Sequence, residues 1–173
     1  SHLSGRTQVY LMNSLAPKIE AADSSVEGEV DLGFSQVNRL QNERLIQAVL
    51  TWAQPKNQVK SWPEIWDLYA GAGNFSFPLF GAHRNSTLVA VELSQKNVIL
   101  GQAQLGKMNL SPLKFKFILA DVGAFLKRAV LPAGGLILLD PPRSGCEKDA
   151  IASLAAQNFD RLLYVSCNPA TLN

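Results

Sequence analysis

A cysteine closes an apolar run near the end of the chain, in a position that suits a reactive thiol. Cys167 follows the run 162–166 and precedes Asn168 and Pro169. A free cysteine commonly packs as a small hydrophobe, but one at the carboxyl end of a strand, among polar residues, is placed to meet a ligand. We therefore predict that Cys167 is a nucleophile beside a bound nucleotide cofactor. Cys146 has only a loop context, and we assign it no chemistry.

A glycine-containing segment indicates where that cofactor binds. In the segment 67–74, Gly71 and Gly73 permit a tight turn and the close approach of a ligand, because neither has a Cβ. Ser76 stands where a G-x-G-x-x-G dinucleotide motif requires its third glycine. Asp67 puts an acid before the loop, which can pair with a cationic methionine moiety and favours S-adenosylmethionine over NAD. For the two glycines alone, a bare structural turn is an equally good interpretation.

Three further carboxylates stand at the ends of apolar runs. Glu92 comes about 20 residues after the glycine segment, where a carboxylate can bind both ribose hydroxyls of an adenosine cofactor. Asp121 can hydrogen-bond the adenine amino group or cap the following helix, and the two roles are compatible. Asp140 opens the sequence Asp-Pro-Pro-Arg, whose prolines fix the backbone next to the reacting centre. Arg143 can contact a phosphate or support this loop.

Together these groups suggest methyl transfer to a pyrimidine base. C5 of a pyrimidine is a poor nucleophile, but addition of a thiolate to C6 makes the ring enolate-like and activates C5 toward a sulfonium methyl group. A base must then remove the C5 proton so that the cysteine can leave, and the sequence offers no evident residue for that step. The target base must also leave its stack, which single-stranded RNA permits at low cost.

The reactive positions follow short apolar runs that alternate with helical segments. This alternation predicts a parallel sheet covered on both faces, in a doubly wound α/β fold. A short strand at 8–12 and an amphipathic helix that ends before Pro55 precede it. The apolar face of that helix comprises Val37, Leu40, Leu45, Ala48, Val49 and Trp52. The expected strands are 65–69, 88–93, 115–120, 136–140 and 162–166, and the expected helices are 75–81, 95–108, 122–129 and 148–157.

Composition limits the class of protein. The 173 residues, 47% of them hydrophobic, suffice for one domain with an ordinary core. A net charge of +2 gives no strong field for a polyanion, so RNA binding has to be argued from the site. Two cysteines and no His or Cys cluster predict neither a disulfide framework nor a metal site. With no evident signal peptide or membrane span, we expect a cytoplasmic protein, and nothing implies a partner protein.

The motifs jointly resemble those of the RNA uracil-5 methyltransferases, which make 5-methyluridine in ribosomal or transfer RNA. The resemblance extends from Phe34 to Leu172 and rests on the segments 34–38, 67–75, 91–92, 140–145 and 166–172. It implies a Rossmann-like S-adenosylmethionine-dependent methyltransferase fold and an RNA substrate, with ribosomal RNA slightly favoured over transfer RNA. It also implies that Cys167 is the nucleophile and that the cofactor pocket is lined by Gln36, Tyr69, Asn74, Glu92, Asp121 and Asp140.

Two features depart from the family pattern. Members continue beyond the cysteine motif into further strands that carry a catalytic glutamate, whereas this sequence stops at Asn173. Many members also have an N-terminal RNA-binding barrel. We therefore expect a lead-in segment, 1–33, and a catalytic domain, 34–173, that is truncated after its fifth strand and lacks its C-terminal end. That truncation predicts an unpaired hydrophobic sheet edge and self-association.

Two other functions stay open on the sequence. A catalytically incomplete S-adenosylmethionine- or RNA-binding module fits the lack of an assignable base. A nucleotide-dependent oxidoreductase of similar fold has only Gly71, Gly73 and Glu92 in its favour. Binding of S-adenosylhomocysteine without binding of NAD would exclude the oxidoreductase.

Overall fold

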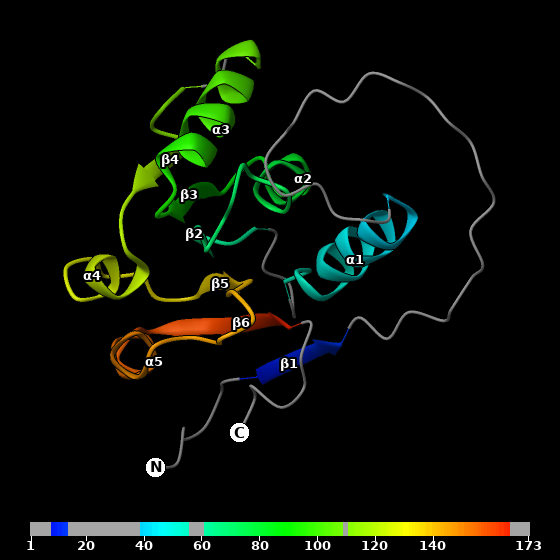
Figure 1. The fold of residues 1–173 in the computed structure, drawn as a ribbon. Helices are drawn as coiled ribbons and strands as arrows, with labels where there is room; N and C mark the ends of the chain where they lie inside the picture. The colour runs from blue at the N-terminus through cyan, green and yellow to red at the C-terminus, as the bar shows by residue number, and fades with distance from the viewer. Residues whose placement is uncertain (1–7, 14–38, 56–60, 109–110, 167–173) are drawn as a thin grey trace.

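Six parallel strands form one sheet in the order β1-β6-β5-β2-β3-β4 (Figure 1). The computed structural model describes residues 8–13, 39–55, 61–108 and 111–166, and for 8–13 it describes the backbone alone. The strands are β1 (Gln8–Asn13), β2 (Glu64–Leu68), β3 (Thr87–Glu92), β4 (Phe115–Leu119), β5 (Gly135–Leu139) and β6 (Phe159–Ser166). All neighbouring strands pair in parallel, which confirms the predicted sheet type.

Within the described ranges, five helices cover the two faces of this sheet. They are α1 (Arg39–Trp52), α2 (Ser76–Ala82), α3 (Gln95–Lys107), α4 (Val122–Leu126) and α5 (Lys148–Ala155). Helices α1, α2 and α3 lie on one face, and α4 and α5 lie on the other (Figure 1). The doubly wound arrangement is therefore confirmed. Several boundaries differ from those predicted, the most for α4, which ends at Leu126, and for β6, which begins at Phe159.

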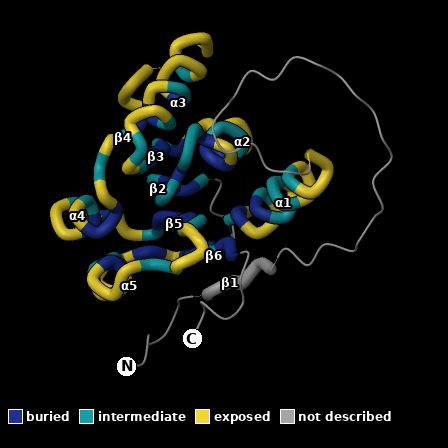
Figure 2. The backbone as a smooth tube through the Cα atoms, viewed as in Figure 1, coloured by how far each residue is buried: buried dark blue, intermediate teal, exposed yellow. Residues whose placement is uncertain are grey.

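An apolar core fills the space on each side of the sheet. Successive side chains of a strand face opposite sides, so Ile65 joins the core beneath α1, α2 and α3, while Trp66 joins the core beneath α4 and α5. All residues of β5 are buried. Figure 2 shows buried central strands under helices whose outer surfaces are exposed. Burial on both faces is what the uninterrupted apolar runs predict.

The strand order reverses between β2 and β5, and this reversal locates the site. From β2 the chain proceeds through β3 to β4 on one side, then returns to the other side of β2 to form β5 and β6. In open parallel sheets, ligands bind beyond the carboxyl ends of the strands at such a reversal. The glycine loop, residues 69–75, and the Asp-Pro-Pro-Arg loop follow these two adjacent strands.

The sheet edge beyond β6 is paired, contrary to the prediction from the sequence. The short strand predicted at 8–12 is present as β1, and it pairs with β6 in a register that places Gln8 opposite Arg161 and Asn13 opposite Ser166. Its backbone occupies the hydrogen-bonding edge that the truncation was expected to leave exposed. Strand β1 is then the outermost strand on this side of the sheet, so the prediction of self-association passes to the outer edge of β1.

Helix α1 packs through a narrower apolar stripe than the sequence predicts. Leu45, Ile46, Val49 and Leu50 contact the core, whereas Leu40 and Trp52 are 67% and 42% exposed. At about 100° per residue, Leu40 lies on the opposite side of the helix from the centre of this stripe. Asn42 falls close to that centre.

The carboxyl end of α1 is held by a buried arginine of β6. Arg161 is 5% exposed, and its guanidinium donates hydrogen bonds to the carbonyls of Trp52 and Gln54. The guanidinium carbon also lies 5.3 Å from the centroid of the Trp62 ring. These contacts satisfy carbonyls that the end of a helix leaves without intrahelical partners.

We expect Arg161→Ala to lower the free energy of unfolding by about 2–3 kcal/mol, because two part-buried carbonyls lose their donor and the buried arginine side chain leaves a void. Chemical denaturation of the two proteins measures the difference. Arg128→Ala removes an exposed arginine and should change the free energy by no more than about 0.5 kcal/mol. Equal effects of the two substitutions would contradict a capping role for Arg161.

Candidate functional site

The glycine loop leaves β2 with an unusual backbone conformation. Tyr69, Gly71 and Gly73 have φ angles of 63°, 57° and 100°. A bulky residue such as tyrosine rarely adopts a positive φ, and it does so only where surrounding contacts fix the backbone. Here the N–H of Ala70 donates to the carbonyl of Val91 at 3.0 Å. The loop is thus tied to β3 from its first residues.

The two glycines of this loop serve different purposes. A Cβ built on Gly71 would meet nothing within 4 Å, so the backbone there is open to a ligand. A Cβ on Gly73 would lie 2.6 Å from the Phe77 ring and 3.0 Å from the Phe117 ring. Gly73 is therefore required by core packing, whereas Gly71 has the open surroundings expected of a cofactor contact.

Glu92 holds the glycine loop and the start of α3 with its two carboxylate oxygens. Oε2 accepts a hydrogen bond from the N–H of Gly71 at 2.9 Å, and Oε1 accepts one from the N–H of Ser94 at 2.7 Å. Each carboxylate oxygen retains a further lone pair. Glu92 can therefore accept ribose hydroxyls without releasing the loop.

Asp67 lies inside the protein. Its side chain is fully buried, Oδ2 accepts a hydrogen bond from the Ser76 hydroxyl at 2.5 Å, and Oδ1 has no protein donor. Burial raises the pKa of Asp67 to about 7; the bond from Ser76 lowers it, and Asp140 and Glu92 raise it further. The expected pairing of Asp67 with a methionine moiety is not supported by this location.

Asp121 and Asp140 follow β4 and β5 at the same edge of the sheet. Asp121 Oδ1 accepts a hydrogen bond from the N–H of Ala124 at 2.8 Å, so its predicted capping role is confirmed. Burial raises the pKa of Asp140 to about 6. The N–H of Asp140 donates to the carbonyl of Leu68 at 3.3 Å, and the N–H of Ala120 donates to the carbonyl of Glu92 at 3.0 Å, so the loop after β5 starts beside the end of β2 and the loop after β4 starts beside the end of β3.

Cys146 is surrounded by tyrosine hydroxyls and is poorly suited to act as a nucleophile. Its Sγ lies 4.0 Å from the Tyr164 hydroxyl oxygen. Burial raises the pKa of the Cys146 thiol, and Tyr164 and Tyr69 offset only part of that rise. Because the thiolate is the reactive form, a raised pKa lowers its reactivity at neutral pH.

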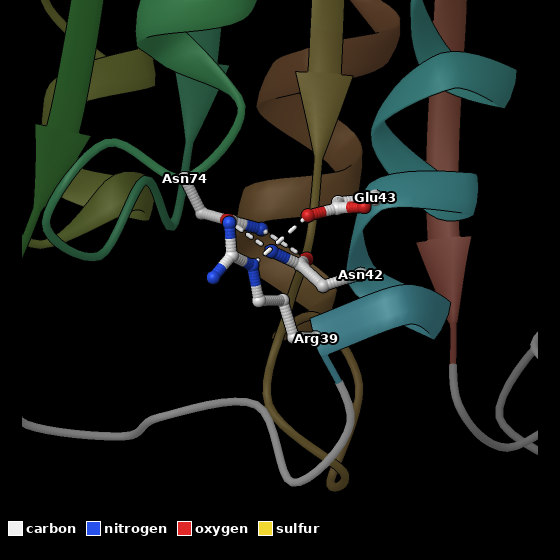
Figure 3. A network of polar contacts seen from close by, with 4 residues as sticks. All are labelled: Arg39, Asn42, Glu43 and Asn74. Carbon is white, nitrogen blue, oxygen red and sulfur yellow. Dashed lines mark hydrogen bonds and ion pairs between the residues drawn. The ribbon is translucent and has the colours of Figure 1, made fainter.

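Asn74 forms a reciprocal amide pair with Asn42 of α1 (Figure 3). Asn42 Nδ2 donates to Asn74 Oδ1 at 2.9 Å, and Asn74 Nδ2 donates to Asn42 Oδ1 at 2.9 Å. Arg39 and Glu43, joined by an exposed ion pair of 3.0 Å, flank the two amides. The pair joins a loop and a helix separated by 32 residues in the sequence.

Asn42 is the residue of this edge that the sequence interpretation did not single out. A signal was present, because Asn42 stands three residues before Leu45 and seven before Val49, on the apolar stripe of α1. A polar side chain on an apolar stripe indicates a polar partner in another element. The sequence could not identify that partner, since Asn74 lies in another segment.

Two of the predicted site residues, Gln36 and Cys167, lie outside the described residues. Those that are described, Tyr69, Gly71, Gly73, Asn74, Glu92, Asp121 and Asp140, follow or end β2, β3, β4 and β5 at the carboxyl edge. In the described part of the chain, no three His, Cys, Asp or Glu side chains are grouped to hold a metal ion. None of the described helices is long and apolar enough to cross a membrane.

The fold is shared with methyltransferases of known structure. Magnesium protoporphyrin IX methyltransferase from Synechocystis PCC 6803, solved with bound S-adenosylhomocysteine, superposes with a TM-score of 0.55 at 20% sequence identity. The superposition covers 76% of this chain and 61% of that one. At this identity the likeness defines the fold class, a Rossmann-like methyltransferase fold.

Sequence relatives are more specific. The family described as tRNA (Uracil-5-)-methyltransferase matches residues 131–173. An uncharacterized RNA methyltransferase of Bdellovibrio bacteriovorus is 36% identical over 141 residues, 82% of this chain and 34% of the relative. The 23S rRNA (uracil(1939)-C(5))-methyltransferase RlmD of Pseudomonas fluorescens is 40% identical over 141 residues, 80% of this chain and 29% of the relative.

The chain thus spans about a third of the length of these relatives. The family match at 131–173 includes the Asp-Pro-Pro-Arg loop and the cysteine motif. The chain belongs to the RNA uracil-5 methyltransferase family.

Proposed function

We propose that the protein containing this chain transfers a methyl group from S-adenosylmethionine to C5 of a uridine in RNA. The observation that carries the proposal is the convergence, at the reversal of strand order, of a glycine loop held by Glu92 and the loop that begins at Asp140. Ligands bind at this place in open parallel sheets. Membership of the RNA uracil-5 methyltransferase family supports the choice of reaction.

The residues at this edge fit an adenosine cofactor. Glu92 is positioned to accept the ribose hydroxyls, the open backbone at Gly71 allows close approach, and Asp121 can accept from the adenine amino group. We assign Gln36, Tyr69, Asn74 and Asp140 to the remainder of the pocket on the family pattern. The cofactor, when bound, supplies an electrophilic methyl group on a sulfonium sulfur.

In this proposal Cys167 activates the base. Its thiolate adds to C6 of the uracil, the C5–C6 double bond becomes a single bond, and the electron pair moves to C5 as an enolate-like centre. After C5 has been methylated, loss of the C5 proton and cleavage of the S–C6 bond restore the aromatic ring and release the thiolate. We assign no residue of this chain to removal of the proton. RNA is the substrate class, and the relatives named for 23S rRNA favour ribosomal RNA.

The alternative is a module that binds S-adenosylmethionine or RNA without turnover. The lack of an assignable base within these 173 residues favours it for this chain in isolation. The whole protein and the chain should then differ: both bind S-adenosylhomocysteine, but only the whole protein methylates.

Methyl-labelled S-adenosylmethionine and unmodified RNA test the proposal. Ribosomal and transfer RNA from cells that lack the enzyme should be supplied separately to the full-length protein, and nucleosides identified by mass spectrometry. Label in 5-methyluridine is the expected result, with ribosomal RNA the better substrate. Label in another nucleoside, or none in either RNA, would overturn the assigned reaction.

Glu92→Ala should weaken binding of S-adenosylhomocysteine by about 10- to 100-fold, because the ribose loses a charged acceptor and the glycine loop loses its bond at Gly71. Titration calorimetry on the chain measures the affinity. Glu64→Ala provides the matched control, since Glu64 is at the opposite, amino-terminal end of β2. An unchanged affinity in Glu92→Ala would refute the ribose assignment.

A further inference from the structure

We infer that Asn42 of α1 is a positioning residue for the cofactor: through its amide pair with Asn74 it holds the glycine loop in the conformation that accepts S-adenosylmethionine. The inference rests on the proposed function. It adds to the site a residue from α1, a helix that precedes the sheet's central strand.

The geometry of the pair is unusually constraining for two short side chains. Each amide donates once and accepts once, at 2.9 Å in both directions (Figure 3). Two hydrogen bonds between planar groups fix the orientation of both planes as well as their separation. Rotation of either amide by half a turn would place oxygen against oxygen and nitrogen against nitrogen. The arrangement therefore fixes Asn74 relative to α1.

Helix α1 is a rigid support for this purpose. Leu45, Ile46, Val49 and Leu50 pack it against the core, and Arg161 binds the carbonyls at its other end. Asn42 lies near the start of the helix, on the side that faces the core. Because α1 is fixed in this way, Asn42 holds Asn74 in a defined position.

The glycine loop benefits from an external support because its backbone is strained at Tyr69. Tyr69 has a positive φ of 63°, and Gly71 and Gly73 also have positive φ angles. Glu92 fixes the loop at Gly71, and the Asn42–Asn74 pair fixes it three residues further on. If the loop is competent to bind only in this conformation, the apparent affinity for the cofactor falls in proportion to the population of that conformation.

The pair leaves Asn74 able to contact a ligand at the same time. An amide has two hydrogens and two lone pairs, and the pair uses one of each. Asn42 therefore supports the family assignment of Asn74 as a pocket residue and does not compete with it.

A double-mutant cycle tests this role. Binding of S-adenosylhomocysteine to the 173-residue chain is measured by titration calorimetry for the unsubstituted protein, Asn42→Ala, Asn74→Ala and the double variant. We expect Asn42→Ala to weaken binding by about 5- to 20-fold, as the loss of two exposed hydrogen bonds permits. In the double variant the affinity should be no lower than in Asn74→Ala, because the two residues act as one unit.

Thr51→Ala is the matched control. Thr51 is an exposed polar residue at the opposite end of α1, and its hydroxyl donates to the carbonyl of Gln47 at 2.8 Å. It should leave the affinity unchanged. Since alanine favours the helix, Asn42→Ala should also keep the thermal unfolding midpoint of the ligand-free protein, which separates positioning of the loop from stability of the fold.

The outcomes are distinct. An affinity that is unchanged or higher in Asn42→Ala, or effects of the two substitutions that simply add, would overturn the inference and leave the proposed function intact. Failure of the unsubstituted chain to bind S-adenosylhomocysteine would overturn the proposed cofactor, and this inference with it.

Discussion

Cys167→Ala in the full-length protein is expected to abolish methylation of uridine, with a loss of at least about a thousandfold in turnover, as is usual when a nucleophile is removed. Without the thiolate, C5 of the uracil stays a poor nucleophile. Affinity for S-adenosylhomocysteine should be unchanged, because in the proposed reaction the thiol contacts the base. Initial rates with methyl-labelled cofactor and calorimetric affinities measure the two quantities.

RNA that contains 5-fluorouridine gives a second readout of the same residue. The analogue has no C5 proton to remove, so the cysteine adduct should persist and appear as a band that resists denaturing electrophoresis. The unsubstituted protein should form this band, and Cys167→Ala should not.

Cys146→Ala is the matched control for both experiments. The Cys146 thiol lies among Tyr69 and Tyr164, and burial raises its pKa, so it supplies little thiolate at neutral pH. The adduct and most of the activity should survive this substitution. Trapping that is lost in Cys146→Ala and retained in Cys167→Ala would reverse the assignment of the nucleophile.

Asp67→Asn is expected to remove most of the pH dependence of stability near neutrality. Burial raises the pKa of Asp67 from 3.8 to about 7 in the folded protein. The folded state therefore holds this proton more tightly than the unfolded state. The stability that it contributes is complete below pH 3.8 and is lost as the pH rises through about 7, by up to about 1.4 kcal/mol per pH unit.

Chemical denaturation between pH 5 and pH 8 measures this loss, of which Asp67 should account for about 2–3 kcal/mol in the unsubstituted protein. In Asp67→Asn the side chain is uncharged throughout and can still accept from Ser76. A smaller slope should persist below about pH 6, because burial also raises the pKa of Asp140, to about 6, with the same sign.

Asp160→Asn is the corresponding surface control. Asp160 is exposed on β6, so its replacement should leave the slope of stability against pH as it is. An unsubstituted protein whose stability is constant or rises from pH 5 to pH 8 would contradict the protonated, buried state assigned to Asp67.

The parallel sheet could be predicted because its central strands are buried on both faces. The runs 65–69 and 136–140 are almost uninterrupted apolar sequence, and each is followed by a helical segment, which leaves few alternatives to a doubly wound fold. The position of β1 could not be predicted. Its pairing with β6 joins residues at the two ends of the chain, and one parallel edge strand carries no signal of its partner.

For the carboxylates, too, the sequence predicted the location of one and left that of another to the tertiary structure. Glu92 was predicted to bind the cofactor because it ends a strand after a glycine loop, and the structure brings it to Gly71. The position of Asp67 before the glycine loop also suggested cofactor binding, yet its side chain lies inside the core and accepts a hydrogen bond from Ser76. Asp67 lies on the face of β2 that α2 covers, and Ser76 of α2 is its hydrogen-bond donor.

The sequence alone therefore determined the fold class, the family and the edge of the sheet at which the site lies, because these depend on local patterns and on motifs read in order. Only the tertiary structure decided what each polar group binds. It separated Gly71, which is open to a ligand, from Gly73, which the Phe77 ring requires, and it paired Asn42 with Asn74 across 32 residues. Such pairings depend on distances between elements, which no local pattern specifies.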